Sequence, residues 1–131
     1  MELKLDGIMI WVESVPETVA FYEKAFGLTA QMMNDEETYA QLTTGETTLS
    51  FAQEDAARTT GISITPHRAK ERPAAFQLAL VSEDVEAAFQ RASQAGAAVA
   101  VPITQKPWGQ RLGYLRDLNG VLIELSSPAA W

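Results

Sequence analysis

Short apolar runs alternate along the chain with two amphipathic stretches, and this order of elements occurs twice. The first run, 7–12, is long enough for a β-strand and too short for a helix. Ser14 and Pro16 then give the signal of a helix start, and Gly27 marks the helix end. Three strand-like runs follow, over 28–33, 38–43 and 47–53. The first half therefore predicts the order β-α-β-β-β.

The second half repeats this plan. A strand-like run at 76–81 precedes a helix expected over 85–95, and Gly96 follows that helix. The two helix ends, Gly27 and Gly96, are separated by about 70 residues. Further strands are expected at 98–103, 110–116 and 121–126. We therefore predict an α+β fold in which two β-α-β-β-β modules form a cup-shaped, eight-stranded mixed sheet.

The length of 131 residues fits one domain. We place module one at about 5–53, a linker at 54–73 and module two at 74–127 of a single domain, 1–131. A loop of this length in a compact domain is either a mobile linker or a lid, and we favour a solvated linker. Four of the ten basic residues of the chain lie in it, namely Arg58, Arg68, Lys70 and Arg72.

Composition excludes several classes of function. The chain has no cysteine and a single histidine, His67, which excludes zinc fingers, iron–sulfur clusters and thiol nucleophiles. A net charge of −7 argues against binding to nucleic acid, because phosphate backbones need clustered Lys and Arg. No apolar run is long enough to span a membrane, and the charged opening is unlike a signal peptide. We expect a cytoplasmic protein.

The residues around the first predicted helix and the last hairpin resemble the vicinal oxygen chelate superfamily, the group of glyoxalase I, extradiol dioxygenases and bleomycin-resistance proteins. The run 12–22 is similar to the opening strand and helix of that family, with the Phe21-Tyr22 pair, and 25–28 is similar to its helix exit. The run 114–125 resembles its closing hairpin, with Leu118 where proline is usual. The resemblance implies a glyoxalase/bleomycin-resistance-like domain over nearly the whole chain, closest to the metal-free bleomycin-resistance-like branch.

The resemblance also implies where a metal would bind, at one position on the first and one on the fourth strand of each module. These positions are occupied here by Gly7, Ser50, Gln77 and Glu124. Glu124 is a good ligand for a hard metal and Gln77 an acceptable one, whereas Gly7 has no side chain and Ser50 is a weak ligand. We therefore expect neither a bound metal nor another cofactor.

Strand alternation gives each sheet one aliphatic face and one face of mixed polar and apolar residues, and it independently assigns these four positions to the mixed face. We expect the mixed face to line the cup and the aliphatic face to pack under the helices. The expected ligand-binding residues also lie on or near the mixed face: Met9, Trp11, Tyr39, Ser50, Gln77, Trp108, Arg111, Tyr114 and Glu124. The aromatic members would supply flat walls, although core or dimer contacts would explain them equally well. Arg111 is a candidate partner for an anion, and a solvated surface cation is the simpler interpretation.

Glu124 is the candidate acid/base, because its carboxylate would be partly desolvated in an apolar cup. A carboxylate satisfied by Gln77 or by water is the structural alternative. One carboxylate without a metal does not supply the charge stabilisation that isomerase chemistry needs, so we assign no catalytic residue firmly.

Three functions remain open at this stage. The first is metal-free binding or sequestration of a small aromatic or cationic molecule, as in the resistance branch, by a protein that we expect to be a homodimer. The second is a divalent-metal-dependent, glyoxalase-like lyase or isomerase, or a dioxygenase. The third is a scaffold or regulatory module with an empty cup. We favour the first.

Overall fold

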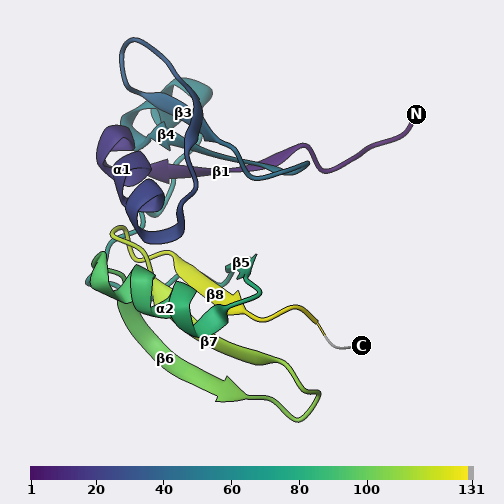
Figure 1. Cartoon of the computed structure of the whole chain (residues 1–131). Coiled ribbons are helices and arrows are strands. Elements are labelled where there is room, and N and C mark those ends of the chain that lie inside the picture. Colours follow the sequence, from purple (N-terminus) through teal and green to yellow (C-terminus); the bar gives the residue numbers. More distant parts are fainter. Residues whose placement is uncertain (130–131) are drawn as a thin grey trace. The chain divides into compact units, whose positions relative to one another are not determined.

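A computed structural model describes residues 1–129, and the chain divides into two compact units that are described separately (Figure 1). The first unit comprises residues 1–23 and 27–66, and the second comprises residues 24–26 and those from 67 onward. The order of elements confirms the predicted α+β class and the repeated β-α-β-β-β plan. The eight strands form two open sheets of four strands each.

The first sheet has the strand order β1-β4-β3-β2, in which β1 and β4 are parallel and the other pairs antiparallel. The strand β1 has the predicted bounds, whereas β2, β3 and β4 are one or two residues shorter than the sequence predicts. The elements along this part of the chain are β1 (Gly7–Val12), α1 (Val15–Phe26), β2 (Ala30–Met33), β3 (Tyr39–Leu42), β4 (Thr48–Gln53) and the short 3₁₀ helix η1 (Glu54–Thr60).

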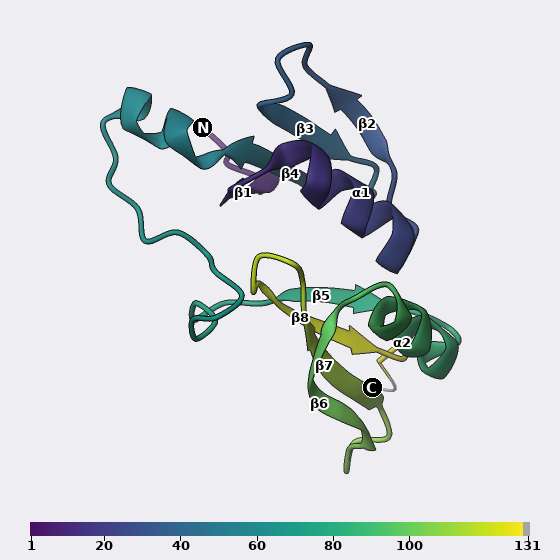
Figure 2. The ribbon, with the colours of Figure 1, turned by 90° about the vertical axis from the view of Figure 1, so that its left-hand side faces the viewer.

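The second sheet repeats this topology with the order β5-β8-β7-β6, and Figure 2 shows α2 lying along one side of it. The strand β5 begins two residues later than predicted, so Gln77 lies just before it. The elements are β5 (Leu78–Val81), α2 (Val85–Gln94), β6 (Ala98–Gln105), β7 (Arg111–Arg116) and β8 (Leu122–Ser126). Within residues 1–129, none of the helices has the length and apolarity that crossing a membrane requires.

The predicted boundaries of the first helix are confirmed in atomic detail. The hydroxyl of Ser14 accepts a hydrogen bond from the backbone N–H of Glu17 at 3.3 Å, which satisfies one of the donors left over at the helix start. Gly27 adopts the left-handed conformation, with φ 70°, and its N–H caps the last turn. These two caps therefore define where α1 begins and where it ends.

The second half of the aliphatic face of β1 is buried as alternation predicts, because Ile10 and Val12 are 3% and 1% exposed, whereas Ile8 at the start of the strand is 36% exposed. Tyr22 of α1 and Phe51 of β4 are both fully buried, with ring centroids 4.9 Å apart. Aromatic side chains contribute more buried apolar area than other residues, so this pair is a central contact of the first unit. The opposite face of the same strands is left more open.

The second unit packs its helix against β7 at a position that only glycine can occupy. A Cβ atom on Gly113 would lie 2.7 Å from Cε2 of Phe89 in α2 and 2.9 Å from the carbonyl oxygen of Val101. Both distances are shorter than real Cβ contacts, so any side chain there would force α2 or β6 to move. Gly113 thus allows Phe89 of α2 to pack directly against the backbone of β7.

The C-terminal part of the linker, residues 67–72, is largely exposed, as a solvated linker would be, but hydrogen bonds hold its backbone. The guanidinium group of Arg116 in β7 donates to the carbonyl oxygens of Glu71 at 2.6 Å, Ala69 at 3.3 Å and Arg68 at 3.4 Å, and also to that of Gly120 at 2.9 Å. The planar fork of arginine donors suits such a multiple contact. We conclude that Arg116 fastens this part of the linker to the β7–β8 turn.

We predict that Arg116→Ala exposes this segment to protease, because three of the lost hydrogen bonds hold it in place. Tryptic cleavage after Arg68 and Lys70 should accelerate about tenfold, given roughly 1.5 kcal/mol for a hydrogen bond to a charged group. Cleavage after the exposed Arg58 in η1 is the internal control and should keep its rate. Equal acceleration at all three sites would instead indicate general destabilisation, and unchanged cleavage after Arg68 and Lys70 would contradict the fastening.

Candidate functional site

The mixed face of the first sheet carries a pocket of about 310 Å³. Ten residues line it, seven of them from the strands and three from the segment that precedes β1. They are Lys4, Leu5, Asp6, Gly7, Ile8, Met9, Tyr39, Gln41, Thr48 and Ser50. This volume is at the lower end of the range for ligand sites, roughly 300–1,000 Å³, and fits a small molecule of one or two rings.

The floor of this pocket follows from the strand register. Ser50 of the central strand β4 is paired on one side with Met9 of β1 and on the other with Gln41 of β3, and Gln41 is paired in turn with Met32 of β2. Residues paired across a sheet lie on the same face. The four side chains therefore form one row across the first sheet, and three of them line the pocket.

Two polar contacts define the chemistry of the pocket. The amide nitrogen Nε2 of Gln41 donates to the hydroxyl oxygen of Tyr39 at 2.9 Å. Ser50 is only 5% exposed, and within residues 1–129 its hydroxyl has no hydrogen-bond partner. Because no fully enclosed side-chain nitrogen or oxygen in that range lacks a partner, the Ser50 hydroxyl is reachable from the pocket. The pocket thus offers neutral hydroxyl and amide groups between apolar walls.

The structure brings together three of the residues that the sequence proposes for ligand binding, Met9, Tyr39 and Ser50. Trp11 does not line this pocket and is half-buried in the neighbouring row, which it shares with Ala52 and Tyr39.

Sequence reasoning missed Gln41, although its alternation with Ala40 and Leu42 places it on the same face as Tyr39. It also missed Lys4, Leu5 and Asp6. Nothing in their pattern distinguishes them from an exposed end segment.

The second sheet has an equivalent row, in which Glu124 of the central strand β8 is paired with Ala79 of β5 and Tyr114 of β7. The Tyr114 hydroxyl donates to Oε1 of Glu124 at a long distance of 3.4 Å. Burial raises the pKa of Tyr114 above its ordinary value, and the charge of Glu124 and the hydrogen bond raise it further. The candidate acid/base therefore faces a neutral phenol, a partner that sequence reasoning did not assign to it.

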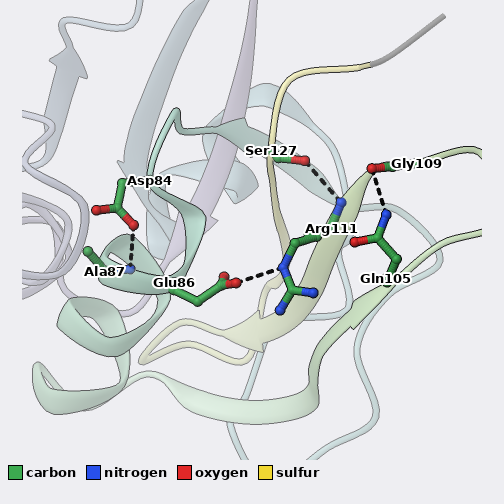
Figure 3. A network of polar contacts seen from close by, with 7 residues as sticks. All are labelled: Asp84, Glu86, Ala87, Gln105, Gly109, Arg111 and Ser127. Carbon is green, nitrogen blue, oxygen red and sulfur yellow. Dashed lines mark hydrogen bonds and ion pairs between the residues drawn. The ribbon is translucent and has the colours of Figure 1, made fainter.

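Arg111 is not presented as a free cation. Its Nε atom lies 2.6 Å from Oε1 of Glu86 in α2, and its backbone N–H donates to the hydroxyl of Ser127 (Figure 3). The two charged side chains are 42% and 55% exposed, so the ion pair contributes under about 1 kcal/mol to stability. The contact directs the Arg111 side chain toward α2, and anion binding by Arg111 stays a prediction.

Two further candidates lie at the ends of strands. Trp108 occupies the turn before β7 and is 51% exposed, with its indole N–H donating to Oε1 of Gln110 at 2.9 Å. Gln77 is exposed immediately before β5. Neither residue contributes to the pocket of the first unit.

The four positions at which the resemblance implies metal ligands do not supply a suitable donor set. Gly7 has no side chain, and a Cβ atom there would lie 2.7 Å from the carbonyl oxygen of Thr48. Ser50 offers a neutral hydroxyl, Gln77 lies outside its strand, and Glu124 is the single anionic donor. Divalent ions in oxygen sites usually take six or more ligands, several of them charged. In the described part of the chain, no three His, Cys, Asp or Glu side chains are grouped to hold a metal.

Comparison with known proteins supports the fold at the level of a family. A family model described as the Glyoxalase/Bleomycin resistance protein/Dioxygenase superfamily matches residues 4–125. A search of curated proteins found no significant match.

Several solved structures share this fold at low sequence identity. A glyoxalase-related enzyme from Fulvimarina pelagi has a TM-score of 0.82 and 19% identity, over 97% of this chain and 89% of that one. A glyoxalase/bleomycin resistance protein/dioxygenase family enzyme from Burkholderia phytofirmans has a TM-score of 0.81 and 18% identity, over 95% and 98%. TioX from a Micromonospora species has a TM-score of 0.72 and 22% identity, also over 95% and 98%. At such identities the likeness concerns the fold alone.

The Tyr114–Glu124 contact predicts a pH dependence. Glu124→Gln should lower the pKa of Tyr114 toward its ordinary value near 10.0 without fully restoring it, because burial remains. Since the pKa is raised in the folded state, the stability that this proton contributes is complete below about pH 10 and is lost as the pH rises through the folded-state pKa. The tyrosinate absorbance of each variant, minus that of its Tyr114→Phe derivative, measures the shift. Glu83→Gln is the control, and an unchanged Tyr114 pKa in Glu124→Gln would refute the contact.

Proposed function

The chain belongs to the Glyoxalase/Bleomycin resistance protein/Dioxygenase superfamily, and we propose that it is a metal-free member that binds or sequesters a small aromatic or cationic molecule. The observation that carries this proposal is the pocket of the first unit, which Met9 and Tyr39 line together with the reachable Ser50 hydroxyl. Apolar and aromatic walls with a few placed polar groups are typical of small-molecule sites.

The donor set is the second support. At the positions where a metal-dependent relative would need several ligands, this chain has a glycine, a hydroxyl, an exposed amide and one carboxylate. A divalent ion bound through so few donors would keep most of its water and would be held weakly. The alternative is a divalent-metal-dependent, glyoxalase-like lyase or isomerase, or a dioxygenase, and the experiment below tests it directly.

We predict that chelator-treated protein binds the neutral fluorescent probe N-phenylnaphthylamine in this pocket. Met9→Lys should weaken binding at least about tenfold, because it replaces an apolar wall with a charge. Met32→Lys is a matched control: the two methionines are 41% and 42% exposed and belong to the same row, but only Met9 lines the pocket. The measurement is a fluorescence titration, repeated with ethidium as an aromatic cation.

The metal-free proposal and the metal-dependent alternative make opposite predictions for metal retention. If the proposal is right, elemental analysis after incubation with nickel, zinc, manganese or iron(II) and desalting should find far less than one metal ion per chain. Retention of about one ion per wild-type chain and its loss in Glu124→Gln would overturn the proposal in favour of metal chemistry. Equal probe binding by wild type, Met9→Lys and Met32→Lys would show that the pocket is not the site.

We also propose that the protein is a homodimer that uses the exposed side of β6. This strand is the outer one of its sheet, and its Val101, which is paired with Tyr114 and so lies on the same face as Tyr114 and Glu124, is 42% exposed. Pro102 and two irregularities in the pairing of β6 with β7 hinder the addition of a further strand, so we expect side-chain packing to hold the dimer.

Val101→Lys should shift the protein from dimer to monomer in analytical ultracentrifugation at micromolar concentration, because it places a charge in an apolar contact. Ile62→Lys replaces an equally apolar residue of the linker that is 54% exposed, and it should leave the dimer intact. A monomeric wild-type protein, or a Val101→Lys variant that stays dimeric, would refute this interface.

A further inference from the structure

The hydrogen bond between Gln41 and Tyr39 leaves a defined pattern of donors and acceptors in the pocket. Because Nε2 of Gln41 donates to the Tyr39 oxygen, the Tyr39 proton is available to another acceptor, and the Gln41 carbonyl oxygen is available to another donor. The reverse orientation of the amide would give the same result, since it exchanges the two roles between the residues. In either case the pair presents at least one donor and one acceptor side by side, and the second N–H of the Gln41 amide is a further donor.

Ser50 adds a third polar group beside this pair. It is directly opposite Gln41 in the strand register, lines the pocket and is 5% exposed. Water can hydrogen-bond to this hydroxyl before a ligand binds, so a ligand that covers Ser50 without hydrogen-bonding to it loses about 1–3 kcal/mol relative to one that does. The polar groups of Tyr39, Gln41 and Ser50 thus lie along the floor of one pocket, and none of them carries a charge.

The rest of the pocket provides a surface for a flat, neutral molecule. Met9, with its polarisable thioether, is on the opposite side of Ser50 from Gln41 in the register, and Leu5 and Ile8 add apolar area. The two charged lining residues, Lys4 and Asp6, have opposite signs, so the pocket as a whole selects for neither anions nor cations.

We infer that the ligand of this pocket is a neutral planar ring whose edge carries a hydrogen-bond donor next to an acceptor, as in a lactam, a pyridone or an oxopurine. The lactam N–H and C=O match the acceptor and donor of the Gln41–Tyr39 pair, and the ring lies over Met9. This inference rests on the proposed binding function and specifies its ligand class. It replaces the choice between an aromatic and a cationic guest with a neutral heteroaromatic one.

The test compares two probes that differ in a single donor, carbostyril, which is a bicyclic lactam, and N-methylcarbostyril. Equilibrium dialysis with the full-length protein measures both affinities. Wild type should bind carbostyril at least about tenfold more tightly, because methylation leaves the pocket acceptor without a partner. Gln41→Met should remove this discrimination while the fold is retained by circular dichroism. Gln31→Met is the matched control, since Gln31 is exposed on β2 and outside the pocket.

The outcomes separate this inference from the proposed function. Equal affinity of wild type for both probes, or discrimination that survives in Gln41→Met, overturns the lactam assignment and leaves small-molecule binding intact. The same holds if N-phenylnaphthylamine binds and carbostyril does not. If none of the four aromatic probes binds (N-phenylnaphthylamine, ethidium, carbostyril and N-methylcarbostyril), both the inference and the proposed function fail.

Discussion

The parallel pairing of the first and last strands of each unit is the constraint on which the site depends. It makes β4 and β8 central strands, so that a residue on either has a paired neighbour on both sides. Ser50 and Glu124 occupy the equivalent central positions, and each is flanked by side chains on the same face. A change at either residue therefore acts on groups in two neighbouring strands. The chemistry of each mixed sheet face is therefore set by a row of paired side chains on neighbouring strands and not by a single side chain.

The two rows differ in a way that matters for function. In the first unit the hydroxyl of Ser50 lies between the thioether of Met9 and the amide of Gln41. All three groups are neutral, and all three residues line the pocket. In the second unit a carboxylate lies beside a phenol whose pKa is raised. Neutral hydrogen-bonding groups favour a ligand whose shape and whose donors and acceptors match theirs. They bind it reversibly and without a change in protonation. The first row is suited to recognition, whereas the second holds the single carboxylate of the four metal-equivalent positions.

Much of the fold follows from the sequence because its signals are local. Alternation, the Ser14 cap and Gly27 define strands and a helix from neighbours a few residues apart, and the structure confirms them. The site is harder to predict because its contacts are not local. The partnership of Gln41 with Ser50 depends on strand register, and Lys4 and Asp6 reach the pocket from a segment without periodicity. The fastening of residues 67–72 by Arg116 joins parts of the chain more than forty positions apart.

Arg116 also explains why the linker carries no pattern of its own. A segment that is held through its backbone carbonyl oxygens needs no particular side chains. The contact depends instead on the donor, Arg116, and on the space around its guanidinium group. Gly120 supplies that space: its φ of 90° suits glycine, and a Cβ atom there would lie 2.6 Å from the carbonyl oxygen of Arg68. The specificity of the contact is therefore encoded in the β7–β8 turn. Residues 67–72 of the linker are therefore held in place by Arg116 and Gly120, which lie outside the linker.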